Sequence, residues 1–133
     1  MIHARSSLVA LVAVALSAGA ALAQDPGEEE YMQACAACHG ETGIGDGPLA
    51  GLMTVSVPDL TQLSARNDGA FPMLSVVQII DGRTGVRGHG YPMPVWGDRF
   101  KAEAMPDAGK YGAELIVRGR VLSIAYFLES IQK

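Results

Sequence analysis

The stretch Cys35-Ala36-Ala37-Cys38-His39 has the pattern C-x-x-C-H. On one turn of helix, two thiols three residues apart lie close enough for each to form a thioether with one vinyl group of a haem. The histidine that follows is then carried beneath the iron as an axial ligand. The motif therefore predicts one covalently attached haem, held by Cys35 and Cys38, with His39 as the first iron ligand.

Three other uses of the two cysteines fit the surrounding sequence less well. A structural disulfide between Cys35 and Cys38 would form a tight ring at the end of a helix. A thioredoxin-like dithiol needs a strand and a helix around it, and no strand pattern precedes Cys35. A zinc site needs four ligands. Residues 24–133 offer only Cys35, Cys38, His39 and His89 as thiolate or imidazole groups.

The first 23 residues have the three parts of a secretory signal peptide. Arg5 supplies positive charge, Leu8 to Leu16 is an apolar run, and Ala21-Leu22-Ala23 supplies small residues before the cleavage point. The apolar stretch is shorter than the roughly 20 residues that a membrane-spanning helix needs. We therefore expect a signal peptide over residues 1–23, cleavage after Ala23, export to the periplasm and no stable membrane insertion. The mature domain is expected to cover residues 24–133.

The composition favours a small, loop-rich domain without a surface for nucleic acid. The chain has 133 residues, a formal net charge of −4, 16 glycines and only 6% aromatic residues. Sequence-independent binding of nucleic acid needs a basic surface, which this acidic balance does not supply. Because aromatic side chains are few, the core is expected to be thin. We predict that a buried haem supplies much of its apolar mass and that the chain without haem folds poorly.

Apolar periodicity predicts an all-α chain of short helices joined by long loops. Helices are expected over about 28–38, 72–81 and 112–131, with a helical turn over 58–63. Residues 40–48 and 82–97 are rich in glycine and are expected to be loops. The apolar residues expected to face the core are Leu74, Val77 and Ile80 in the second helix, and Val117, Val121, Ile124, Ala125 and Leu128 in the last.

The second axial ligand is expected on another element, across the haem from His39. Residues 24–133 contain five methionines and one further histidine, His89. Met93 lies between Pro92 and Pro94, and flanking prolines restrict the backbone that carries its thioether. We predict Met93 as the sixth ligand, ahead of His89, and assign the other four methionines no role at the iron. An iron with both axial positions filled has no open site, which favours electron transfer over catalysis.

With these motifs the chain resembles a class I cytochrome c of the small bacterial periplasmic kind, over essentially all of residues 24–133. The resemblance implies the class I cytochrome c fold, with short helices and long loops wrapped around one haem c. Gly27 and Tyr31 stand where the family's first helix contacts its last. The stretch Ile124-Ala125-Tyr126 resembles the segment that crosses there, with Tyr126 as its aromatic residue.

Two further parts of the resemblance concern the haem itself. Gly47-Pro48-Leu49 resembles the family's Gly-Pro pair, whose proline carbonyl accepts the Nδ1–H of the haem histidine, and this implies a contact from His39 to Pro48. The stretch from Tyr91 to Gly97 is similar to the family's Met-ligand loop. Trp96, with Arg87 or Arg99, is a candidate partner for the haem propionates.

Basic residues are concentrated around the loop that carries Met93. Arg83, Arg87, Arg99 and Lys101 bracket it, whereas residues 24–80 contain Arg66 as their only Lys or Arg. One hypothesis is a basic rim at the haem edge that steers the protein toward an acidic partner. The alternative is an ordinary mixed surface.

The function that fits these features is a mono-haem periplasmic carrier that shuttles single electrons between respiratory donors and acceptors, and not an enzyme. Its redox partner proteins are not encoded in any motif. A second reading is a dedicated haem c subunit of a periplasmic dehydrogenase or reductase complex. A third is a gas-binding or peroxidatic haem protein with a labile sixth site, which binding of carbon monoxide would favour. A fourth is a thiol redox protein without haem.

Overall fold

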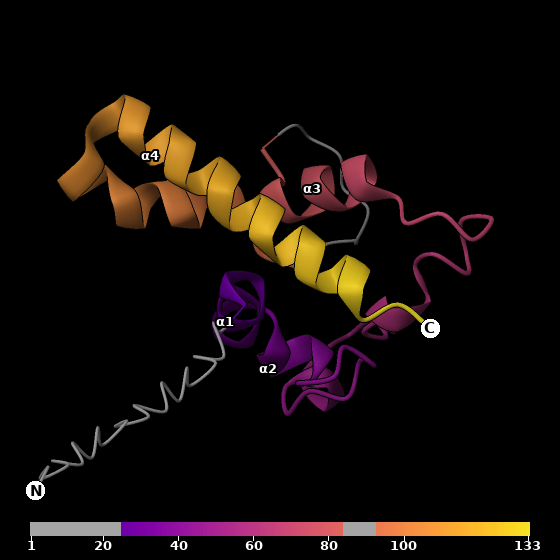
Figure 1. Ribbon diagram of the computed structural model, residues 1–133. Helices are drawn as coiled ribbons and strands as arrows, with labels where there is room; N and C mark the ends of the chain where they lie inside the picture. Colours follow the sequence, from indigo (N-terminus) through magenta and orange to yellow (C-terminus); the bar gives the residue numbers. More distant parts are fainter. Residues whose placement is uncertain (1–24, 84–92) are drawn as a thin grey trace, which may run out of the picture.

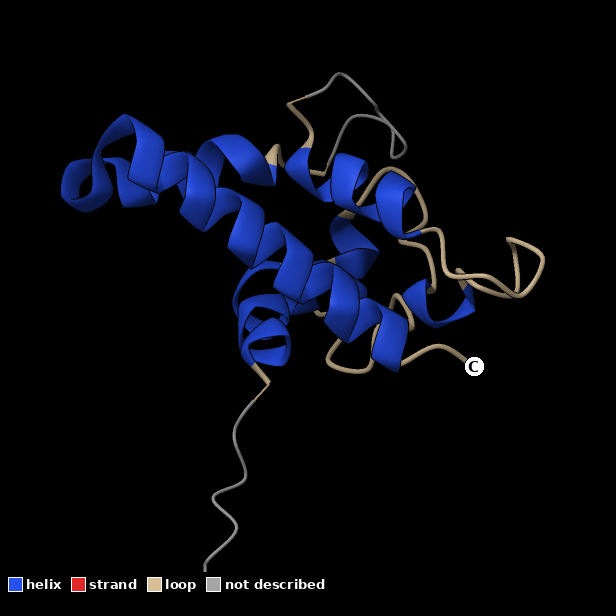
Figure 2. Ribbon diagram, turned by 45° about the horizontal axis from the view of Figure 1, so that its top comes forward, coloured by secondary structure: helices blue, strands red, loops and turns tan. Residues whose placement is uncertain are grey.

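The computed structural model describes residues 25–83 and 93–133, and all regular structure in these residues is helical (Figure 1). The elements are α1 (Pro26–Ala34), α2 (Ala36–His39), the 3₁₀ turns η1 (Ala50–Leu52) and η2 (Leu60–Gln62), α3 (Met73–Asp81) and α4 (Trp96–Ser130). Long loops separate them, and no strand occurs in the described residues (Figure 2). The all-α prediction is confirmed. The predicted signal peptide, Arg87, His89 and Tyr91 lie outside the described residues.

The first predicted helix is interrupted at Cys35. α1 begins after Asp25, whose carboxylate accepts a hydrogen bond from the Gly27 N–H at 2.8 Å. Glu28 and Glu29 in its first turn lie at the positive end of the helix dipole. Cys35 has φ −117°, well away from the helical value, and α2 follows it as a separate turn. The expected continuous helix over 28–38 is therefore wrong, and the haem-attachment motif lies at the break.

The last helix is longer than predicted and doubles back on itself. Gly109 has φ 63° and ψ −177°, so α4 consists of a first limb, 96–108, and a second limb, 110–130, which form a hairpin (Figure 1). Pro106 weakens the end of the first limb because its ring nitrogen carries no hydrogen-bond donor. The sequence prediction missed the first limb because only Gly97 and Phe100 are buried in it, which leaves no apolar stripe.

α1 crosses the second limb of α4, as the family resemblance implied. Tyr31 is fully buried, and its ring centroid lies 5.0 Å from that of Phe127. Gly27 lets the two backbones approach closely, since a Cβ there would overlap the carbonyl oxygen of Ser123. The aromatic partner is Phe127 and not Tyr126, whose side chain is 56% exposed. The contact is confirmed and its predicted aromatic residue is wrong by one position.

The core lies between α4 and the shorter helices packed on it. The five predicted core residues of the second limb are all buried. In α3 the prediction is confirmed for Ile80, which is buried, and for Val77, which packs against the core. It is wrong for Leu74, which is 70% exposed, and it missed Val76, which is buried. Val76 and Ile80 are four residues apart, so both lie on the side of α3 that packs against the core. Gly82 ends α3 in the left-handed conformation, as expected from the sequence.

The last residues of the chain are hydrogen-bonded to η2 and to the turn that follows it. Gln132 donates through Nε2 to the Leu60 carbonyl at 2.8 Å and accepts at Oε1 from the Ser64 N–H at 2.9 Å. The Lys133 N–H donates to the Thr61 carbonyl at 3.0 Å. These bonds place η2 beside the end of α4. Within the described residues, none of the helices combines the length and the apolar character needed to cross a membrane.

Candidate haem site

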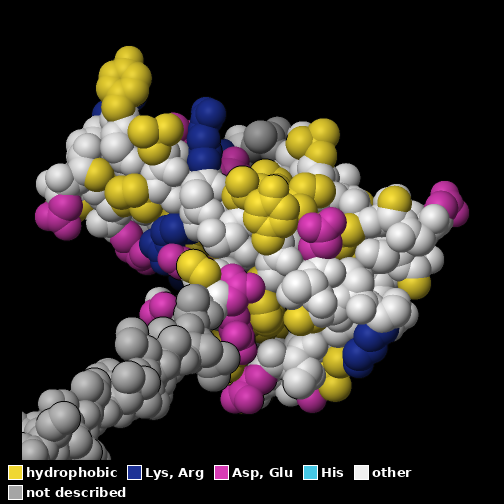
Figure 3. Space-filling model, viewed as in Figure 1, with side chains coloured by type: hydrophobic (Ala, Val, Ile, Leu, Met, Phe, Trp, Pro, Cys, Tyr) yellow, Lys and Arg dark blue, Asp and Glu magenta, His cyan; other side chains and the backbone are white. Residues whose placement is uncertain are grey.

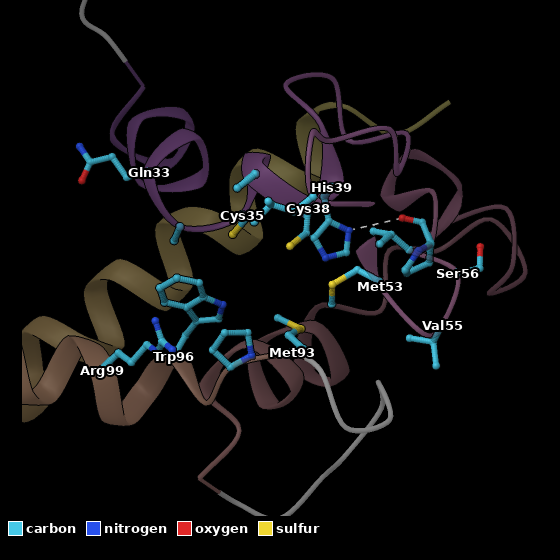
Figure 4. Close-up of a pocket in the computed structure, with 16 residues that line it drawn as sticks. Gln33, Cys35, Cys38, His39, Met53, Val55, Ser56, Met93, Trp96 and Arg99 are labelled. Atoms are coloured by element: carbon cyan, nitrogen blue, oxygen red, sulfur yellow. Dashed lines mark hydrogen bonds between the residues drawn. The ribbon is translucent and has the colours of Figure 1, made fainter. Parts of the chain in front are cut away.

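A cavity of about 510 Å³ lies beside α2 and brings the predicted haem-binding side chains together (Figure 4). Cys35, Cys38 and His39 line it from the haem-attachment motif, and Met93 reaches it from the segment that leads into α4. The volume falls within the range of about 300–1,000 Å³ that is typical of ligand and cofactor sites. Residues far apart in the sequence therefore meet at one site that has room for a large flat cofactor.

The backbone of α2 sets the spacing of the motif. The N–H groups of Cys38 and His39 both donate to the Cys35 carbonyl, at 3.1 and 2.9 Å, which closes a single turn. The loop that follows is bound to this turn, because the Gly47 N–H donates to the Cys38 carbonyl at 3.2 Å and the Leu49 N–H to the Ala37 carbonyl at 2.9 Å. Both cysteines are unbridged, as thioether attachment requires.

The environment of Cys35 does not suit thiol redox chemistry. Burial, followed by the neighbouring Cys38 thiol and Glu30 carboxylate, raises the pKa of Cys35 to about 12. Reactive redox cysteines have a lowered thiol pKa, so Cys35 has the opposite property. Among the described residues, no three His, Cys, Asp or Glu side chains gather into a metal site. Neither the dithiol nor the zinc alternative gains support.

The His39 ring is buried and held from behind by a proline carbonyl. Its Nδ1 lies 3.4 Å from the carbonyl oxygen of Pro58, and the other ring nitrogen is turned into the cavity (Figure 4). A contact of this kind orients a ligand histidine and selects the nitrogen left for the metal. The carbonyl oxygen beside Nδ1 belongs to Pro58, and not to Pro48 as the resemblance implied.

Two methionine side chains enter the cavity, and sequence reasoning assigned a role to only one. Met93 and Met53 are both half-buried, and both point into the space below His39 (Figure 4). Met53 follows η1 directly, in an apolar stretch without flanking prolines, so nothing in the sequence marks it. The assignment of Met93 as the sixth ligand remains a prediction. Met53, the other methionine in the cavity, is the residue against which that assignment has to be tested.

The opposite wall of the cavity is aromatic and carries one charge. Trp96, in the first turn of α4, lines it together with Pro94. Arg99 is the only charged side chain among the described residues that line the cavity, and its guanidinium carbon lies 5.3 Å from the centre of the Trp96 ring. This wall therefore offers an indole N–H and a cation, and the role of Trp96 and Arg99 toward the haem propionates remains a prediction.

Two of the four residues of the basic rim expected around the Met93 loop form ion pairs, and the steering role of the rim remains a hypothesis. Arg83 and Lys101 both contact the carboxylate of Glu114. Arg99 is exposed, and Arg87 lies outside the described residues. Two exposed apolar side chains, Leu49 and Val55, also line the cavity.

Comparison with known proteins agrees with the geometry of this site. The family model described as Cytochrome c matches residues 24–111, which is more than half of the chain. The chain therefore belongs to the cytochrome c family, and both the class I resemblance and the fold class are confirmed. No curated protein and no solved structure matches the chain.

Family membership identifies the cofactor as covalently bound haem c and the general role as electron carriage. The site fits this group, because two unbridged thiols, a buried imidazole and an aromatic wall surround one cavity. When bound, haem c supplies a one-electron Fe(III)/Fe(II) couple. Such a carrier implies redox partner proteins.

Proposed function

We propose that the chain is an exported, periplasmic mono-haem electron carrier. In this proposal Cys35 and Cys38 attach the haem, and His39 and Met93 are the axial ligands. The observation that carries the proposal is that both thiols, the imidazole and the Met93 thioether line one cavity of about 510 Å³. The leader over residues 1–23, with its charged start and apolar run, supports export.

The protein side chains have three tasks in this proposal. The Pro58 carbonyl holds the His39 ring so that one nitrogen faces the iron position. Trp96 and Pro94 exclude water from the far wall of the cavity. With His39 and Met93 at the two axial positions, no place remains for a substrate, which favours outer-sphere electron transfer over catalysis. A methionine ligand also raises the reduction potential.

The experiment is a pair of identical substitutions in the same cavity. The full chain is produced in a host with a periplasmic cytochrome c maturation system, and the mass of the purified protein tests for one haem and for cleavage after Ala23. Absorption spectra are then recorded for the oxidised, reduced and carbon-monoxide-treated protein. We expect Met93→Ala to abolish the weak Met–Fe(III) charge-transfer band and to admit carbon monoxide, and Met53→Ala to do neither.

Two results would contradict the assignment of the sixth ligand. If Met53→Ala removes the charge-transfer band and Met93→Ala leaves it, Met53 is the ligand. If the unchanged protein already binds carbon monoxide readily, the sixth site is open or labile, and gas binding or peroxidatic chemistry becomes the better reading. Absence of covalent haem would reject the whole proposal.

A second candidate, the dedicated haem subunit of a redox complex, is favoured by the outer face of α4. Tyr111, Leu115, Leu122 and Tyr126 are 89%, 71%, 40% and 56% exposed, and their spacings of four and seven place them on one side of the helix. Hydrophobic side chains gather over this helix and at the tip of its hairpin (Figure 3).

Native fractionation of the source cells separates the two candidates. A subunit co-elutes with a redox enzyme at a mass well above that of the monomer, and Leu115→Glu should release it. A free carrier elutes at its own mass with or without the substitution.

A further inference from the structure

The described residues on either side of 84–92 lie against each other, and we call this contact the neck. On one side the neck consists of Gly82 and Arg83 after α3, and on the other of Val95 and Gly97 at the start of α4. A Cβ built on Gly82 would lie 3.2 Å from a methyl group of Val95. A Cβ built on Gly97 would lie 2.5 Å from Nε of Arg83. The two sides of the neck are therefore packed directly against each other.

Arg83 closes the neck with three hydrogen bonds. Its Nε donates to Asp81 Oδ1 at 2.7 Å, and its Nη1 and Nη2 donate to the two carboxylate oxygens of Glu114 at 2.8 and 3.2 Å. The three side chains are only 15–30% exposed. A bidentate arginine–carboxylate pair of this kind fixes direction as well as distance, and partial burial reduces its screening by water.

Glu114 joins this neck to both limbs of α4. Its carboxylate lies 3.5 Å from the Lys101 ammonium on the first limb and 3.3 Å from Arg118 Nε on the second. One carboxylate thus faces three cations, with Asp81 as the second acid in the cluster. Removing its charge would break the bond to Arg83 and would also leave three cations close together, which repel one another.

We propose that Glu114 and Arg83 are positioning residues for Met93. By holding the neck together they fix the start of α4 at Trp96, three residues after Met93, and so hold the thioether at the iron position. This inference depends on the proposed function, in which Met93 is the sixth ligand. Neither residue lines the cavity, so each acts only through the backbone that it holds.

The test compares two Glu→Gln substitutions on the same helix. Glu114→Gln breaks the clamp. Glu103→Gln is the matched control, because Glu103 pairs with Arg120 at 2.6 Å and takes no part in the neck. The holoproteins are compared by the intensity of the Met–Fe(III) charge-transfer band and by the rate of carbon monoxide binding to the reduced form. We expect Glu114→Gln to weaken the band and to raise that rate by about three- to five-fold, with Glu103→Gln at the level of the unchanged protein.

A second variant opens the neck without changing charge. Gly97→Ala places a methyl group against Asp81 and Arg83, and we expect it to shift the band and the rate in the same direction. Arg83→Lys keeps the charge but loses the bidentate geometry, so we expect changes in the band and the rate that lie between those of the unchanged protein and Glu114→Gln. This variant tests the proposal if Glu114→Gln fails to fold.

The outcomes separate this inference from the proposed function. If Met93→Ala abolishes the band but Glu114→Gln, Arg83→Lys and Gly97→Ala behave like the unchanged protein, the clamp is wrong and the ligand assignment stands. If Glu103→Gln has the same effect as Glu114→Gln, the cause is general destabilisation and the clamp is again wrong. If Met93→Ala leaves the band intact, the ligand assignment itself fails.

Discussion

Removal of the Tyr31 hydroxyl gives a direct measure of how the first helix is locked to the haem-attachment turn. The hydroxyl donates to the Gly40 carbonyl at 2.6 Å, and Gly40 directly follows His39. The ring is fully buried against Phe127, with 5.0 Å between centroids. Tyr31→Phe keeps this packing and removes only the hydrogen bond.

The size of the effect depends on what happens to the acceptor. The Gly40 carbonyl also accepts from the Gly43 N–H at 3.2 Å, so it keeps one partner after the substitution. The loss is therefore the net value of one hydrogen bond, about 1 kcal/mol, and not the larger cost of an orphaned buried carbonyl. For a domain of this size that corresponds to a fall in melting temperature of about 3–6 °C.

The assay is reversible thermal or denaturant unfolding of the holoprotein, followed by circular dichroism. The matched control is Tyr126→Phe, the same change on α4 at a side chain that is 56% exposed. We expect the control to change the free energy of unfolding by less than about 0.5 kcal/mol. The absorption spectrum of Tyr31→Phe should be unchanged, because no iron ligand is touched. Equal stability losses in the two variants, or none at Tyr31, would refute the reasoning.

Three further predictions follow from the packing and the charges. Gly27→Ala should destabilise the protein by about 1–3 kcal/mol, since its methyl group would overlap the Ser123 carbonyl; Gly51→Ala, where a Cβ meets nothing within 4 Å, is the control in the same unfolding assay. The hydrogen bond from Arg83 is the main cause that lowers the pKa of Glu114 from 4.5 to about 2, so the stabilisation from the ionised Glu114 carboxylate is present above pH 4.5 and is lost as the pH falls toward 2. Denaturant titrations between these pH values should show the unchanged protein losing its stability advantage over Glu114→Gln as the pH is lowered. A difference in stability that stays constant with pH would contradict this. The chain produced without haem should lack a cooperative thermal transition in calorimetry, and a sharp transition would show that the core does not need the cofactor.

The sequence determined the chemistry of the haem-attachment turn because that chemistry is local. Cys35, Cys38 and His39 lie within one turn, which the N–H groups of Cys38 and His39 close by donating to the Cys35 carbonyl. The buried stripe of α4 was equally predictable, since an apolar periodicity over Val117 to Leu128 leaves the helix one face to bury.

Which residues the haem-attachment turn and the buried stripe of α4 contact depends on the tertiary structure. One position along a helix turns a side chain by about 100°, so the direction of approach between α1 and α4 decides for Phe127 over Tyr126. In the same way, the Leu60 N–H donates to the Gly43 carbonyl at 2.7 Å, a contact between separate segments beside which Pro58, and not Pro48, meets the His39 ring. The clamp of Glu114 on Arg83 and the presence of Met53 in the cavity also depend on contacts between distant segments, and no local pattern records those contacts.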